Sequence, residues 1–231
     1  MSIVTPGIGI TLATNGSGSG VTLQANGPAN IMIACAPADP ATNTGGFSLA
    51  VISGLPQTLY PAVNVFSQTY NTKFIINTAS TYGTPTGFTF LNNWFWSDYD
   101  VDLVSVSQTY NPDDTAQALV IPSNNGVRGS YAITPGNKCM FSVTHAIWSG
   151  TSGFDGVGVG SATMDYIGID RWLGNDNQAI GIFDDGQVFT NGNSVASGYA
   201  IFETNGQIID VAVDTVNNKM WYRVAGGVWQ G

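Results

Sequence analysis

Residues that favour helices are scarce in this chain, and this scarcity limits its fold more than any other feature. Only 9% of the 231 residues are charged, Lys and Arg together number six, and Glu203 is the one glutamate. Long helices draw on Glu, Lys, Arg, Leu and Ala. Gly, Thr, Asn, Ser, Val and Tyr are abundant instead, and these residues favour strands and tight turns. The sequence therefore predicts an all-β protein.

The charge and hydrophobicity of the chain exclude several functions. A hydrophobic fraction of 43% is enough to form a core, and the net charge is −9. Without a basic patch, we expect no binding to nucleic acid or to anionic membranes. No apolar run reaches the roughly 18 residues of a membrane-spanning helix, so we expect no membrane insertion. The first residues also lack the pattern of a secretory signal.

Two regions differ in organisation. Residues 1–37 alternate apolar and polar side chains around a Gly/Ser-rich turn, which indicates a hairpin too small to bury a core alone. We interpret this region as an N-terminal β arm that makes assembly contacts. Residues 38–231 contain many short strand-like runs separated by turn residues, a spacing typical of an antiparallel sandwich.

Several segments of the rear half follow one another in a recognisable order. They are YNPDD at 110–114, VRGS at 127–130, KCMFSV at 138–143, VGVG at 157–160, IGIFDDGQVFTNG at 180–192, IIDVAVD at 208–214, NKMWYRV at 218–224 and GVWQG at 227–231. In this order they resemble the SPRY domain. The resemblance implies an antiparallel, concanavalin-like jelly-roll sandwich that binds peptides or glycans through loops at one end.

The closing segments of that family occur at the front of this chain. They are DPATNTGG at 39–46, LYPAV at 59–63, FII at 74–76 and YGTPTGF at 82–88. Residues 38–92 thus resemble the family's C-terminal strands, residues 108–231 its N-terminal strands, and residues 93–107 connect them. Either the domain is circularly permuted within one chain, which we favour, or each front half completes a neighbour's sandwich. Both arrangements predict that residues 60–66 and 74–76 join the sandwich of residues 208–213 and 220–224, and that Asp39 lies near Gly231.

Most residue types associated with chemistry have a structural interpretation here. Cys35 and Cys139 lie in apolar runs and are expected to be buried free thiols. The glycines at 156–160 are interpreted as part of a strand, since no helix pattern follows them as in a dinucleotide-binding loop. Asp98, Asp100 and Asp102 alternate as on a solvated strand face, and they do not match a calcium-binding loop.

The titratable residues also give no catalytic pattern. His145 is the one histidine and follows an apolar strand, so we expect a structural role. Asp184 and Asp185 are interpreted as turn residues. Glu203 lacks the second carboxylate that glycoside hydrolysis needs. We therefore predict no enzymatic activity, no catalytic residue, no metal site and no cofactor.

Aromatic residues beside amides and carboxylates suggest a ligand site. Such combinations suit sugars or polar peptides. They flank two expected loops, 149–155 and 170–178, and the predicted site residues are Trp148, Phe154, Arg171, Trp172, Asn175 and Asp176. Trp94, Trp96 and Tyr99 in the connector are the next choice, although core packing explains such aromatics equally well.

The low charge, the abundance of Gly, Thr, Ser and Asn, and the β arm are typical of bacteriophage virion proteins. We therefore predict a non-enzymatic structural and binding module of a phage particle, in a tail fibre, the baseplate or the head decoration. Its expected partners are further copies of itself, other virion proteins and a glycan or protein on the host surface. The alternative is a bacterial carbohydrate-binding or carbohydrate-cleaving sandwich. Glycan binding without turnover would separate these two interpretations.

Overall fold

A computed structural model describes residues 37–65, 72–94, 126–164 and 172–231, and the backbone at 10–14, 21–25, 118–121 and 125. The chain divides into two compact units, residues 1–36 and 37–231. In the first unit, β1 (Ile10–Thr14) pairs with β2 (Val21–Ala25) as an antiparallel hairpin. No helix of the described residues is long and apolar enough to cross a membrane.

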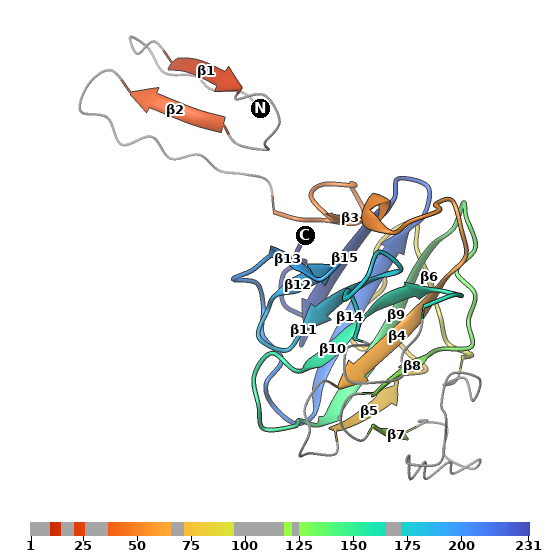
Figure 1. Cartoon of the computed structure of the whole chain (residues 1–231). Helices are drawn as coiled ribbons and strands as arrows, with labels where there is room; N and C mark the ends of the chain where they lie inside the picture. Colours follow the sequence, from red (N-terminus) through yellow and green to blue (C-terminus); the bar gives the residue numbers. More distant parts are fainter. Residues whose placement is uncertain are drawn as a thin grey trace. The chain divides into compact units, whose positions relative to one another are not determined.

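One sheet of the second unit is antiparallel throughout its described pairings and has six strands (Figure 1). Its strands, in spatial order, are β13 (Asn193–Ala196), β12 (Val188–Thr190), β11 (Ala179–Phe183), β10 (Asp155–Ser161), β4 (Leu59–Val65) and β8 (Asn125–Arg128). Strand β4 is thus hydrogen-bonded along both edges, to β10 and to β8.

The other sheet is built around the long strand β9. Its spatial order is β3 (Phe47–Ser48), β15 (Lys219–Val224), β14 (Gln207–Asp214), β9 (Lys138–Ile147), β5 (Thr72–Ile76) and β7 (Ala118–Ile121). The short strand β6 (Thr89–Phe90) pairs with β9 in parallel. A single helical turn, η1 (Leu49–Val51), follows β3.

The hydrophobic core lies between the two sheets. Val157 and Val159 of β10 and Phe141 and Val143 of β9 are all fully buried in one cluster. These residues alternate with neighbours that point to the outer faces, as the two-residue period of strands requires. The fold is therefore an all-β sandwich of two sheets, which confirms the predicted all-β antiparallel sandwich, while the jelly-roll form that the resemblance implies stays a prediction.

The predicted pairing of the front of the chain with its rear is confirmed. Strand β4 pairs with β10 over its full length, and β5 pairs with β9. In Figure 1 the orange strand β4 lies directly beside the green strands of the rear half. The two ends of the unit also meet, because Ala38 forms a bridge with Trp229, and an added Cβ on Gly45 would lie 2.8 Å from the carbonyl oxygen of Gly231.

The glycine-rich segment at 156–160 forms strand β10, as expected. Its glycines alternate with the core valines, so they lie on the outer face of the six-stranded sheet. Small residues on that face make room for the connection between β10 and β11. Leu173 of this connection lies against Gly181, where an added Cβ would come within 2.7 Å of the Leu173 Cβ, and a small cluster there contains Ala62, Met164, Leu173 and Ala179.

The structure also places two of the residues singled out in the sequence, Cys139 and Trp94, in the core. Cys139 is a buried free thiol, as predicted, and burial raises its pKa to about 12. Trp94 is a core residue, 4% exposed and packed edge-on against Phe141 at 5.7 Å between ring centroids. The predictions for Cys35, Trp96, Tyr99, Asp98, Asp100 and Asp102 concern residues outside the described part of the chain.

The closure between the front and the rear can be tested at Gly46. This residue has a φ of +96°, and an added Cβ would lie 2.7 Å from the buried Trp221 ring. We expect Gly46→Ala to lower the free energy of unfolding by roughly 2–4 kcal/mol, since it adds a clash to backbone strain. Gly87→Ala is the matched control, with a φ of +84° and no atom within 4 Å. Urea unfolding measures both variants. An equal loss of unfolding free energy in the two would contradict the close contact between Gly46 and the Trp221 ring.

Candidate functional site

Three connections meet at one end of the sandwich. They follow β9, β11 and β13, and backbone hydrogen bonds tie them to one another or to the ends of β9 and β10. The Phe202 N–H donates to the Asp184 carbonyl at 2.9 Å, the Asp184 N–H donates to the Asp155 carbonyl at 2.9 Å, and the Gly206 N–H donates to the His145 carbonyl at 2.7 Å. Loops held on a rigid sandwich commonly carry binding function, so this end is the candidate site.

Asp184 holds the connection between β9 and β10 in place. Its Oδ1 accepts backbone N–H bonds from Gly153 at 2.8 Å, Phe154 at 2.9 Å and Asp155 at 3.3 Å. Its Oδ2 accepts the indole N–H of Trp148 at 2.7 Å. The side chain comes directly after the last residue of β11 and is fully buried. One carboxylate thus fixes both ends of the 148–154 loop.

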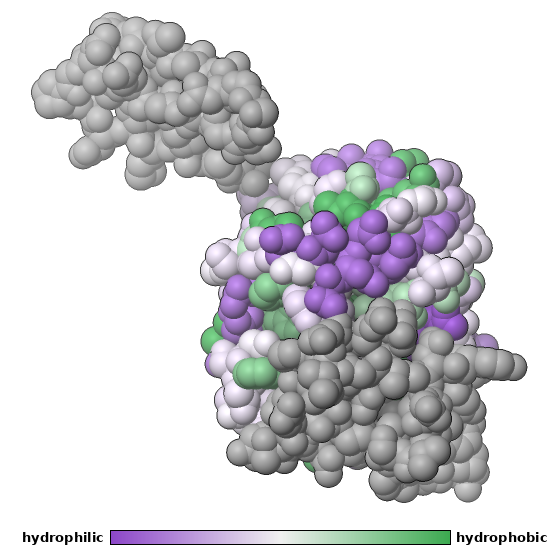
Figure 2. Space-filling model, viewed as in Figure 1, coloured by the Kyte–Doolittle hydropathy of each residue, from purple (hydrophilic) through white to green (hydrophobic). Residues whose placement is uncertain are grey.

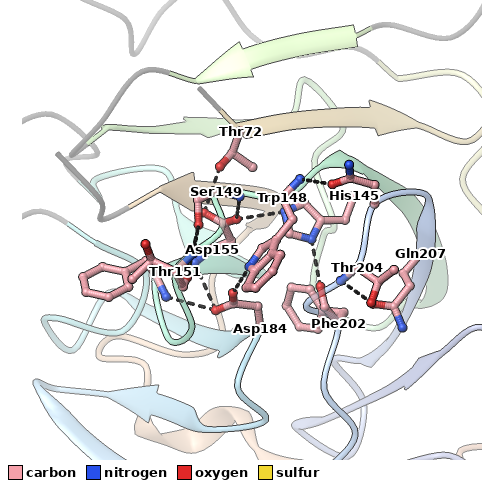
Figure 3. A network of polar contacts seen from close by, with 12 residues as sticks. Thr72, His145, Trp148, Ser149, Thr151, Asp155, Asp184, Phe202, Thr204 and Gln207 are labelled. Atoms are coloured by element: carbon pink, nitrogen blue, oxygen red, sulfur yellow. Dashed lines mark hydrogen bonds and ion pairs between the residues drawn. The ribbon is translucent and has the colours of Figure 1, made fainter. Parts of the chain in front are cut away.

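Asp155 joins the two sheets through a second set of polar contacts (Figure 3). Its Oδ2 contacts the His145 Nε2 at 2.9 Å and accepts the Ser149 N–H at 3.0 Å, while its Oδ1 accepts the Thr72 hydroxyl at 2.9 Å. Asp155 begins β10 of one sheet, whereas His145 and Thr72 belong to β9 and β5 of the other. All four residues are buried.

Both ring nitrogens of His145 have a partner. Its Nδ1 lies 2.9 Å from the Phe202 carbonyl oxygen, which can only accept, so Nδ1 donates this hydrogen bond. Its Nε2 lies 2.9 Å from Asp155 Oδ2. The imidazole thus connects the backbone of the loop after β13 to the first residue of β10.

This arrangement leaves His145 no access to a nucleophile. Both ring nitrogens are engaged, and the ring is enclosed by Phe74, stacked at 4.8 Å between centroids, and Phe202, edge-on at 5.7 Å. The Ser149 hydroxyl donates to the Thr151 carbonyl instead, at 3.1 Å. The imidazole acts as a bridge in the core, which agrees with the structural role expected from the sequence.

The burial of Asp184 affects its protonation. Burial raises its pKa from 3.8 to about 6, and the neighbouring Asp155 carboxylate adds to the rise. Hydrogen bonds from the Trp148 indole and from the backbone of Asp155 and Gly153 oppose this shift by stabilising the carboxylate. Asp184 is thus a buried acidic group that titrates in a mildly acidic range.

Two of the residues predicted to bind a ligand lie at this end. Trp148 and Phe154 flank the loop that Asp184 holds, and both are partly exposed. Ile147, beside Trp148, is 45% exposed. The sandwich end therefore presents aromatic and aliphatic side chains to solvent over a rigid polar support.

The other predicted residues lie elsewhere. Trp172 packs edge-on against Phe183 and Phe189, at 5.5 and 5.1 Å between ring centroids. The Asp176 carbonyl accepts the Asn191 N–H at 3.0 Å, and Asn175 approaches Gly192, so both lie by the turn between β12 and β13. That turn is at the opposite end of β11 from Asp184. Arg171 lies outside the described residues.

Sequence reasoning missed the two aspartates that organise this end. Asp185 behaves as the expected turn residue, with its Oδ1 accepting the Gln187 N–H at 3.0 Å. Asp184 was interpreted in the same way, but it is the buried acceptor for the neighbouring loop. Asp155 is the first residue of the wholly buried strand β10, and Asp184 directly follows the wholly buried strand β11. A carboxylate at the end of an apolar strand is the feature of the sequence that could have indicated a buried, hydrogen-bonded aspartate.

In the described parts of the chain, no group of three or more His, Cys, Asp or Glu side chains is arranged to hold a metal ion. No family model, curated protein or solved structure matched this chain. The resemblance to SPRY domains accordingly remains a prediction.

The bridge between the sheets can be tested by graded substitutions. We expect His145→Leu to lower the free energy of unfolding by about 3–5 kcal/mol, because it leaves Asp155 buried without its principal partner. Thr72→Val keeps the shape of the side chain and removes one hydrogen bond to Asp155, so it should cost about 1 kcal/mol. Urea unfolding measures both. A His145→Leu loss no greater than that of Thr72→Val would contradict the role of the pair.

The titration of Asp184 predicts a pH dependence. Its folded-state pKa of about 6 lies above the value of 3.8 assigned to the unfolded chain, so the folded state binds the proton more tightly. The contribution of Asp184 to stability is therefore fully present below pH 3.8 and is lost as the pH rises through about 6. The change amounts to at most about 3 kcal/mol.

Asp184→Asn isolates this contribution, because it keeps an acceptor for the loop and removes the titration. The unfolding free energies of the two proteins are compared in urea between about pH 4 and pH 7. We expect the unfolding free energy of the wild type, minus that of the variant, to become smaller as the pH rises towards 6. A difference that stays constant with pH would refute the assignment.

Proposed function

We propose that this chain is a non-enzymatic structural and binding module of a bacteriophage particle, located in the virion as part of a tail fibre, the baseplate or the head decoration. The observation that carries the proposal is the division of the chain into a sandwich and a separate β-hairpin unit. A sandwich supplies a rigid body, and a hairpin supplies a means of joining one body to another.

The size of the hairpin supports an assembly role. It consists of two five-residue strands, and a two-stranded hairpin alone is marginally stable in water. Its register pairs Leu12 with Leu23 and Ile10 with Ala25. Since residues two apart share a face, these apolar positions form one row of the hairpin. Such a row calls for another apolar surface, and we propose that further copies of this chain or other virion proteins provide it.

The candidate site supports binding rather than catalysis. The imidazole of His145 is fully engaged in the core, and the aspartates beside it are occupied by loop and strand contacts. The same end presents exposed Ile147 and partly exposed Trp148 and Phe154, beside the exposed polar residues Ser152, Thr204 and Asn205. We propose that these side chains recognise a glycan or a protein on the host surface. A site of this kind needs shape and rigidity, and the network beneath supplies both.

The assembly role is tested by removing the hairpin. We expect a chain that begins at residue 37 to keep its sandwich and to lose its oligomeric state, because the unit 37–231 contains the whole core cluster. Native mass spectrometry gives the assembly mass, and circular dichroism checks the fold. A truncated chain with the assembly mass of the full chain would refute the role of the hairpin. Immunogold labelling of purified particles tests the virion location.

A further inference from the structure

Two aromatic rings from distant segments flank one guanidinium on the outer face of the sheet built around β9, which has seven strands when β6 is included. Arg223 of β15 lies over the ring of Trp229, 4.5 Å from its centroid, and 6.0 Å from the centroid of Tyr82. Tyr82 belongs to the segment between β5 and β6, and Trp229 follows β15. From this geometry we propose that Tyr82, Arg223 and Trp229 form a binding platform for a neutral saccharide.

The backbone holds both rings in position. Gly226 lies beneath the Tyr82 ring so closely that any side chain there would displace it. Trp229 is fixed by its bridge to Ala38, and the next residue, Gln230, exchanges backbone hydrogen bonds with Tyr222 at 2.7 and 3.2 Å. Rings held before binding lose little freedom when a ligand arrives, and this favours affinity.

The polar part of the platform is a buried ion pair. The Arg223 Nε donates to Asp210 Oδ2 at 2.8 Å, and its Nη2 donates to the Gly83 carbonyl. Asp210 is fully buried and Arg223 is 9% exposed. The second carboxylate oxygen, Asp210 Oδ1, is buried, and among the described residues it has no hydrogen-bond partner. The ion pair with Asp210 holds the guanidinium in place beside the two rings.

The large exposed side chains beside this pair are aromatic or aliphatic. Tyr82 is 41% exposed and Val228 is 70% exposed. A sugar ring matches such a surface, since its C–H face packs on aromatic rings while its hydroxyls both donate and accept hydrogen bonds. The guanidinium is already paired with Asp210 and the chain has a net charge of −9, so a neutral saccharide fits better than an anionic one.

This platform is distinct from the sandwich end described above. Arg223 and Asp210 lie on the outer face of the sheet, whereas His145 and Asp155 lie between the two sheets. The inference therefore does not depend on the proposed role of Trp148 and Phe154. Figure 2 shows hydrophobic patches interspersed with hydrophilic ones on the visible part of the described surface.

The test uses the full chain and a panel of free neutral sugars: D-glucose, D-galactose, D-mannose, N-acetyl-D-glucosamine and lactose. Saturation-transfer NMR detects binding, and titration gives the dissociation constant, expected at about 1 mM for the best sugar. We expect Tyr82→Ala and Trp229→Ala each to weaken binding roughly fivefold or more. Circular dichroism confirms that each variant is folded.

Tyr131→Ala is the matched control, because Tyr131 is 39% exposed at a different place, and it should leave the affinity unchanged. Trp148→Ala reports on the sandwich end. Loss of binding in Trp148→Ala alone would place the sugar at that end, overturning the platform and supporting the loop site. An equal loss in Tyr131→Ala, or no saturation transfer to any sugar of the panel, would also overturn the platform. Neither result would bear on the assembly role of the hairpin.

Discussion

Closure of the sandwich depends on two strands from the front of the chain. Strand β4 is bonded along both edges, to β10 and β8, and β5 lies between β9 and β7. Without them, the six-stranded sheet would be divided and the core valines of β10 would lie at an open edge. Backbone groups at such an edge would need other partners. The core, the candidate site and the outer-face platform all follow from this closure.

The polar network at the sandwich end gives that closure a fixed register. Hydrophobic packing tolerates small slips between sheets, whereas the contacts of Asp155 with His145 and Thr72 require particular atoms to meet. Buried ionic groups add little net stability, but they penalise arrangements that leave them unpaired. We infer that the network selects one alignment of the two sheets. It also fixes the loop that carries Trp148, so the residues proposed for recognition and the core residues share the same support.

The fold class could be predicted from the sequence because composition and alternation act locally. The pairing of residues 60–66 and 74–76 with the rear strands was predicted from the order of motifs, and no local pattern in those segments indicates it. The candidate site was harder to predict. Trp148 and Phe154 were chosen as aromatics beside a loop, but the spacing of residues 170–178 gave no sign that Asn175 and Asp176 lie at the far end of β11. Asp184 was missed because its neighbour Asp185 has the ordinary signature of a turn.

The double pairing of β4 has a consequence during synthesis of the protein. The ribosome delivers residues 59–65 well before residues 125–128 and 155–161, which cover the two edges of that strand. The nascent chain must carry an apolar segment with both edges uncovered until most of the protein has emerged. Contacts between residues so far apart in the sequence form slowly, and uncovered strands can pair with the wrong chain. The yield of folded protein should therefore depend on translation rate and chaperone supply more strongly than its final stability would suggest.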